Sequence, residues 1–202
     1  MSKYIKIGVG LVLAIILFYS LKGSNQFNLN QYVAEVDEHR QQKDRFMKFN
    51  AESPLPENLR EPFSNLMYYP VDTSYRKIAT LEPIENSRII TLDMTGGQPE
   101  KYREYGYARF SHQGNMVNLL VLRSLESGDL FLPFLDQSNG KGTYGGGRYL
   151  DPKEISSNRI LIDFNFAYNP FCVFSETYNC PVPPLQNKVP FAVEAGEKMW
   201  EM

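Results

Sequence analysis

Apolar and polar positions change their spacing along the chain, and each change predicts a different element. Residues 7–21 form an uncharged apolar run, residues from about 29 to 49 repeat with helical spacing, and short strand-like segments follow from residue 66. Turn sequences rich in Gly, Asn, Asp and Ser separate these segments, which indicates an antiparallel meander. We expect a mainly β protein, an antiparallel sandwich or partly closed barrel, preceded by an N-terminal transmembrane helix and one amphipathic helix.

The apolar run predicts a membrane anchor through residues 5–21. Extended to Tyr4, it would form a helix of roughly 27 Å at about 1.5 Å per residue, against a hydrocarbon core of about 30 Å. Lys3 and Lys6 favour a cytoplasmic N-terminus with the globular part outside, as a single-pass protein of the cytoplasmic membrane. Export after cleavage of a signal peptide is the alternative, although YSLKGSNQ lacks the expected pair of small residues.

The predicted amphipathic helix follows a short polar spacer. Asn28 or Asn30 is a suitable N-cap, and one stripe of the helix carries Tyr32, Val36, His39 and Phe46. The prolines of ESPLPENLREPF end the helix. We therefore divide the chain into an anchor (1–24), a helix with its linker (25–52) and a β-rich domain (53–202).

Period-two patterns and apolar runs predict the strands of that domain. The predicted strands cover residues 66–71, 75–83, 87–94, 102–110, 115–124 and 130–136, with 189–194 as a candidate last strand. MVNLLVL within 115–124 is apolar on both faces, which is typical of a central, covered strand. His112 falls in the turn sequence HQGN and is predicted to be exposed.

Composition removes several classes of function. The formal net charge is −2, so no basic footprint indicates a nucleic-acid partner. The only histidines, His39 and His112, are far apart in sequence. The chain therefore has few residues with which to build a histidine metal site or a catalytic triad. No metal site and no particular cofactor are predicted.

A glycine-rich segment, GKGTYGGGRY, follows the strand predicted at 130–136. Gly140, Gly142 and Gly145 match G-x-G-x-x-G, but a hairpin sequence follows instead of a helix, so we reject a dinucleotide site. The glycines are explained by tight turns or close approach to an aromatic ring. Alternatively, exposed backbone N–H groups and Arg148 form an anion pocket beside Tyr144 and Tyr149.

The segment RILIDFNFAYN (159–169) is predicted to be a strand with one polar face. Alternation places Tyr168 on the apolar face and Asp163, Asn165 and Asn169 on the opposite one. Asp and Asn are disfavoured in strands, so these side chains are expected to hydrogen-bond to a turn, a metal or a ligand.

The two cysteines, Cys172 and Cys180, have seven residues between them. No further Cys or His lies close enough in sequence to complete a zinc site. A domain outside the cytoplasm favours a disulfide between them.

Two long motifs, FLPFLDQSNGKGTYGGGRYLD and DFNFAYNPFCVFSETYNCPVPPLQN, resemble those of the bacterial domain-of-unknown-function family numbered 1684. The segments SPL (53–55), FSNLMYYPVD (63–72) and EAGEK (194–198) fit that resemblance. Gly142 and Gln186 depart from the family pattern, which has glutamate at both positions. The resemblance implies homology and carries no activity with it.

Three classes of function therefore stay open, and whether the protein is an enzyme is undecided. The first is a membrane-tethered module that binds a small polar or anionic ligand or a glycan. Its candidate ligand-binding residues are Tyr144, Arg148, Tyr149, Asp163, Asn165, Tyr168 and Asn169. The second is a hydrolase, with or without metal assistance, in which Asp136, Asp163 and Glu197 are the candidate catalytic residues. The third is a structural or interaction module.

Overall fold

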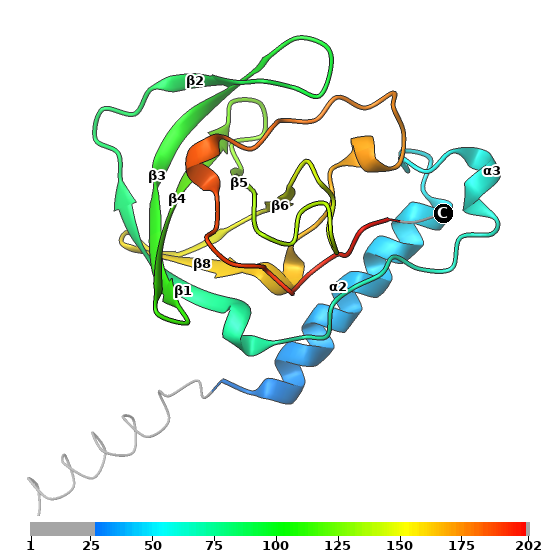
Figure 1. Ribbon diagram of the computed structural model, residues 1–202, viewed down its shortest axis with the longest axis horizontal. Helices are drawn as coiled ribbons and strands as arrows, with labels where there is room; N and C mark the ends of the chain where they lie inside the picture. The colour runs from blue at the N-terminus through cyan, green and yellow to red at the C-terminus, as the bar shows by residue number, and fades with distance from the viewer. Residues whose placement is uncertain (1–26, 201–202) are drawn as a thin grey trace, which may run out of the picture. The chain divides into compact units, whose positions relative to one another are not determined.

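The computed structural model of the chain describes residues 27–200 (Figure 1). By contacts the chain divides into two compact units, Met1–Glu35 and Val36–Met202. Helix α2 (Leu29–Phe49) begins in the first unit, where Asn28 Oδ1 accepts a hydrogen bond from the backbone N of Gln31 at 3.1 Å. The predicted helix and its Asn28 cap are thus confirmed.

A single antiparallel sheet, bent into a half barrel, dominates the second unit (Figure 1). Its path runs β6-β5-β4-β3-β1-β8-β7, and β2 pairs with β3 off this path. The strands are β1 (Arg76–Pro83), β2 (Ile89–Leu92), β3 (Glu100–His112), β4 (Asn115–Ser124), β5 (Leu130–Phe134), β6 (Arg148–Leu150), β7 (Lys153–Ser156) and β8 (Arg159–Asp163). The prediction of a mainly β, partly closed barrel is confirmed, and the sandwich alternative is not what forms.

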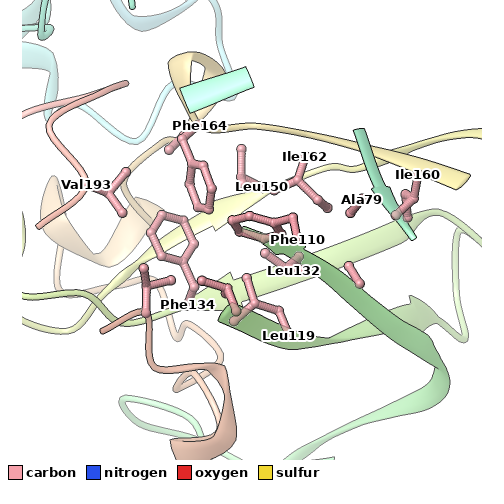
Figure 2. Close-up of a cluster of buried hydrophobic side chains, with 14 of the residues drawn as sticks. Ala79, Phe110, Leu119, Leu132, Phe134, Leu150, Ile160, Ile162, Phe164 and Val193 are labelled. Carbon is pink, nitrogen blue, oxygen red and sulfur yellow. The ribbon is translucent and has the colours of Figure 1, made fainter. Parts of the chain in front are cut away.

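The main core fills the concave side of this sheet. Strand β4 lies third in the path, and its apolar run is buried as predicted: Leu119 and Val121 belong to this core, and Leu120 belongs to a separate cluster with Leu92 and Tyr102. Phe134 of β5 meets Phe164 edge-on, with ring centroids 5.2 Å apart (Figure 2). Ile160 and Ile162 complete the cluster from β8, which lies near the opposite end of the strand order from β5. Alternating apolar residues on several strands therefore share one interior.

A smaller apolar cluster lies under the C-terminal part of α2. Met47 packs there with Leu55, Phe63, Leu66 and Phe174. The proline-rich linker that ends the helix is held by hydrogen bonds, because Arg60, at the end of the short helix α3 (Glu57–Arg60), donates to the backbone oxygens of residues 50, 53 and 55.

Residues 27–200 contain four short 3-10 turns, and one of them, η2, replaces regular strand where the sequence pattern predicted alternation. They are η1 (Thr73–Tyr75), η2 (Phe164–Phe166), η3 (Phe171–Val173) and η4 (Leu185–Asn187). The strand predicted over 159–169 therefore ends at Asp163, because the Asp163 side chain accepts a hydrogen bond from the backbone N of Asn165 and starts η2. The strands predicted at 66–71 and 189–194 were also wrong: of these segments, only Tyr68 makes a β-bridge, to Glu197.

His112 is another correction, because it lies inside the protein instead of on an exposed turn. It is the last residue of β3 and is 3 % exposed. Its ring stacks on Tyr75 at 4.9 Å and lies 4.5 Å from the ring of Phe191. His39, in contrast, is exposed on α2, with its ring edge-on to Phe166 at 5.0 Å.

Within residues 27–200, no helix is long and apolar enough to cross a membrane. The anchor predicted through residues 5–21 lies outside the residues that the structure describes.

Candidate functional site

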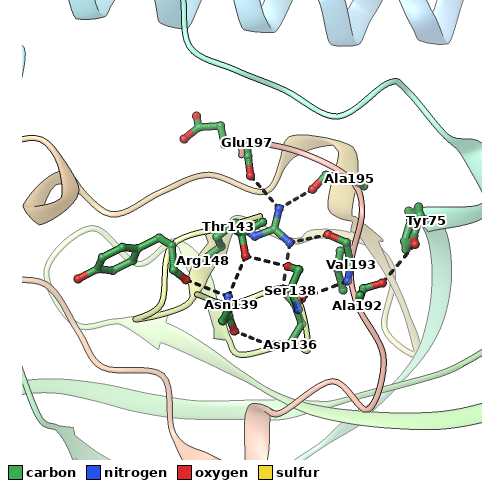
Figure 3. A network of polar contacts seen from close by, with 11 residues as sticks. Tyr75, Asp136, Ser138, Asn139, Thr143, Arg148, Ala192, Val193, Ala195 and Glu197 are labelled. Carbon is green, nitrogen blue, oxygen red and sulfur yellow. Dashed lines mark hydrogen bonds and ion pairs between the residues drawn. The ribbon is translucent and has the colours of Figure 1, made fainter. Parts of the chain in front are cut away.

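Arg148 and Asp136 form a charged pair in the interior, and neither side chain has any exposed surface (Figure 3). Arg148 Nη2 lies 3.1 Å from Asp136 Oδ2, and the guanidinium also donates to the backbone oxygens of Val193, Ala195 and Glu197. Asp136 Oδ1 accepts from the backbone N of Ser138 and of Val193. Both groups therefore hold the segment 193–197 against the glycine-rich loop.

Burial lowers the pKa of the Arg148 guanidinium from its usual value, while the charge of Asp136 acts in the opposite direction. A guanidinium starts from a pKa above about 12, so it stays charged at neutral pH. A ligand anion would have to displace backbone carbonyls and a paired carboxylate to reach it. The contacts of Arg148 thus hold segments of the protein interior together, and they do not form the open anion pocket that the sequence suggested.

The glycine-rich loop is folded on its own side chains. Ser138 and Thr143 hydroxyls lie 2.8 Å apart, and Asn139 Nδ2 donates to the backbone O of Tyr144 at 3.0 Å (Figure 3). Gly147 has φ +94°, and a Cβ there would lie 2.6 Å from the backbone O of Phe134. Here glycine is required both by conformation and by close approach.

Asp163 and Asn165 form a second interior network. Asn165 exchanges two hydrogen bonds with the backbone of Asp72, with Oδ1 accepting at 2.9 Å and Nδ2 donating at 2.8 Å. Asp163 caps η2 and lies 3.5 Å from Nε of Arg76. These two candidates join η1 to η2, which is the turn-bonding alternative predicted for them.

Glu197 forms a third group with two other candidates and with Lys43, which the sequence did not single out. Its Oε1 lies 2.5 Å from Nζ of Lys43, and its Oε2 accepts from the backbone N of Asn169 at 2.7 Å. Lys43 also lies over the ring of Tyr168, 4.6 Å from the centroid, and the Tyr168 hydroxyl donates to Asp151 Oδ1 at 3.0 Å. Candidates Glu197, Asn169 and Tyr168 are thus brought together, and Lys43 connects them.

Asp151 leads from this group to a surface pocket of about 430 Å³. Two carboxylates (Asp129 and Asp151), two hydroxyls (Ser124 and Ser127) and Lys153 line it, together with Tyr102, Leu130, Phe131 and Pro152. Residues 124–131 contribute the hairpin end of β4 and the start of β5, and residues 151–152 connect β6 to β7, which begins at Lys153. The pocket is therefore built by two strand connections that are distant in sequence.

The polar groups of the pocket are available to a ligand to different extents. Ser124 Oγ accepts from the backbone N of Glu126 and of Ser127, and Ser127 Oγ accepts from the backbone N of Asp129. Each hydroxyl can still donate its own proton. The pKa of Asp151 is raised, because burial disfavours the charged carboxylate. The hydrogen bond from Tyr168 and the charge of Lys43 offset only part of this effect.

Cys172 and Cys180 are both free thiols in the structure, so the disulfide stays a prediction. The backbone N of Cys172 donates to Cys180 Sγ at 3.2 Å. Of the remaining candidates, Tyr149 is buried and donates its hydroxyl proton to the backbone O of Pro181, and Tyr144 is half-buried. Across residues 27–200, no three His, Cys, Asp or Glu side chains are grouped as a metal ion requires.

Sequence reasoning missed Asp129, Asp151 and Lys153, because each falls in a turn or at a strand end, where polar residues are ordinary. The usable signal was the Asp-Pro-Lys sequence at 151–153, which begins with the last residue of the first family motif.

The fold and these networks define a single-sheet β half barrel whose interior is braced by a buried ion pair. This chain belongs to the DUF1684 family, described as a protein of unknown function, whose sequence model matches residues 61–198. The resemblance drawn from the motifs is therefore confirmed. The two positions where glutamate was expected from the resemblance are placed differently: a side chain at Gly142 would run into the Tyr69 hydroxyl, and Gln186 is exposed on η4.

A solved relative has the same fold. It is the uncharacterized protein from gene locus rrnAC0354 of Haloarcula marismortui, determined by solution NMR, with 35% sequence identity and a TM-score of 0.66. The match covers 84% of this chain and 95% of that one. A search of the curated proteins gave no match.

Proposed function

We propose that this protein is a binding module for a small, polar, hydroxyl-rich ligand of the sugar or glycan class. The observation that carries the proposal is the pocket of about 430 Å³ with two carboxylates and two hydroxyls in its wall. Small-molecule sites typically have volumes of about 300–1,000 Å³, with a few converging polar groups on a partly apolar wall.

The charges of the pocket select among polar ligands. Asp129 and Asp151 supply two negative charges and Lys153 one positive charge, so the lining has a net charge of −1. Carboxylates accept hydrogen bonds from hydroxyl and ammonium groups and repel anions. A neutral sugar or an amino sugar therefore suits the pocket better than an anionic one.

The Asp151 carboxylate in the pocket wall is held in place by a neighbouring side chain. The Tyr168 hydroxyl fixes the carboxylate, and Lys43, which pairs with Glu197, lies over the Tyr168 ring. A positioned acceptor loses less conformational entropy on binding than a free side chain.

Titration of the full chain with glucose, glucosamine and glucuronate tests this proposal, with the shift in melting temperature and calorimetric affinity as readouts. We expect glucose or glucosamine to bind more tightly than glucuronate. Asp129→Asn and Asp151→Asn should each weaken binding by about tenfold, the equivalent of about 1.4 kcal/mol for one charge-assisted hydrogen bond.

Glu126→Gln is the matched control, because Glu126 is an exposed carboxylate in the same hairpin and does not line the pocket. It should bind like the wild type. Equal binding of all three sugars, no binding of any, or unchanged affinity in both pocket variants would count against the proposal.

We further propose that the module is tethered to the cytoplasmic membrane by residues 5–21, with the half barrel outside. The apolar run and the flanking Lys3 and Lys6 support this arrangement. Alkaline extraction of membranes should leave the protein in the pellet, and external protease should digest the β domain in intact spheroplasts. Release as a soluble protein that begins near Asn25 would favour the cleaved signal peptide instead.

A further inference from the structure

Cys172 and Cys180 are placed for chemistry with each other. The Cys172 backbone N–H donates to Cys180 Sγ at 3.2 Å. The Cys180 sulfur therefore lies beside the backbone of Cys172, where the Cys172 side chain begins.

The two thiols differ in their access to solvent. Cys172 is half-buried on η3, whereas Cys180 is buried, with 5 % of its surface exposed. A small reagent in solution can reach Cys172 more easily than Cys180.

Each cysteine is fixed by a different part of the structure. Cys180 pairs with Thr95, whose backbone N donates to Cys180 O at 2.9 Å and whose Oγ1 accepts from Cys180 N at 3.0 Å. Cys172 is held by η3, where Phe171 stacks on Phe46 of α2 with centroids 6.2 Å apart. Between these anchors, Glu176 and Thr177 are exposed.

We propose that Cys172 and Cys180 form a reversible thiol modification site, in which Cys172 reacts with a small disulfide oxidant and Cys180 resolves the adduct. This inference stands apart from the sugar pocket. It also goes beyond a permanent disulfide, because it assigns an order of reaction to the two thiols.

With glutathione disulfide as the oxidant, the Cys172 thiolate attacks one sulfur and the glutathione S–S bond breaks. The first glutathione leaves as a thiolate and takes up the proton that Cys172 lost. Cys180 sulfur then attacks Cys172 sulfur, the mixed disulfide breaks, and the second glutathione leaves with the Cys180 proton. The protein pair loses two electrons and the oxidant gains two.

The environment of Cys180 fits its role as the second thiol to react. Burial, together with the neighbouring Cys172, raises the pKa of Cys180 to about 12. Cys180 is therefore a poor first nucleophile in solution. Its contact with Cys172 gives it a high effective concentration once the adduct has formed.

Intact-mass measurement of the full chain in oxidised glutathione tests the proposal. The wild type should lose two hydrogens without a lasting adduct, and dithiothreitol should reverse the change. Cys180→Ser should keep one glutathione on Cys172, because it lacks the resolving thiol. Cys172→Ser should react at least about tenfold more slowly, because only the buried thiol remains.

Peptide mapping of the acid-quenched wild type provides a second readout that does not depend on the folding of a variant. The earliest adduct should lie on Cys172. An earliest adduct on Cys180, a wild type that accumulates stable adduct, or a wild type that does not react would overturn the proposal.

Discussion

Replacement of Arg148 by methionine should strongly destabilise the fold. Methionine retains much of the apolar volume but removes the charge, so Asp136 stays behind as a buried carboxylate without its cation. Backbone oxygens of Val193, Ala195 and Glu197 lose their donor at the same time. Removal of one partner from a buried ion pair costs about 3–5 kcal/mol, and we expect a loss in that range.

Urea unfolding followed by tryptophan fluorescence measures this loss as a change in the free energy of unfolding. Arg109→Met is the matched control, because the side chains of Arg109 and its partner Glu82 are 48% and 45% exposed. Exposed pairs contribute about 0–1 kcal/mol, so the control should stay close to the wild type.

The double variant Arg148→Met/Asp136→Asn separates the uncompensated charge from the lost hydrogen bonds. An asparagine at 136 can still accept from Ser138 N and Val193 N, which Asp136 Oδ1 does now. The double variant should therefore recover at least about 1 kcal/mol relative to Arg148→Met alone. A single variant within about 1 kcal/mol of the wild type, or a double variant whose losses simply add, would refute the reasoning.

Three further changes test other parts of the fold. Asn187→Ala should cost about 2–3 kcal/mol, because this buried side chain makes three hydrogen bonds to the backbones of β4 and β5, whereas exposed Asn118→Ala should stay within about 0.5 kcal/mol. Gly147→Ala should be more destabilising than Gly128→Ala, because both have positive φ but only the first lacks room for a Cβ; equal melting temperatures would contradict this. Burial lowers the pKa of His112, so the contribution of neutral His112 to stability is complete above the unfolded pKa of 6.5 and is lost as the pH falls from 6.5 toward the folded pKa. Urea unfolding at a series of pH values should show a smaller loss of stability for His112→Phe. An unchanged slope of the free energy of unfolding against pH would argue against this assignment.

The fold was largely predictable because its main strands follow simple patterns. β3 alternates buried and exposed positions along most of its length, and the apolar run of β4 marks a covered strand. Prediction failed where a side chain overrides the period, as when Asp163 caps η2 and turns the chain before Asn165. Residue spacing does not reveal such a hydrogen bond.

The candidate site was less predictable, because its residues meet only in the folded chain. Arg148 was a candidate for ligand binding and Asp136 for catalysis, but the sequence did not show that they pair with each other or that backbone carbonyls of 193–197 surround the guanidinium. Lys43 lies on a helix with many other charged residues, and nothing local distinguishes it as the partner of Glu197. Asp129 and Asp151 become neighbours only when two strand connections come together.

Backbone-amide NMR shifts of the full chain in detergent micelles, recorded with increasing glucosamine, test the central claim most directly. Binding at the proposed pocket should produce saturable shifts at Ser124, Ser127, Asp129, Asp151 and Lys153, and Asp129→Asn should reduce them. Saturable shifts confined to the glycine-rich loop at 140–147, or no saturable shifts with any sugar of the panel, would contradict the assignment of this pocket as the ligand site.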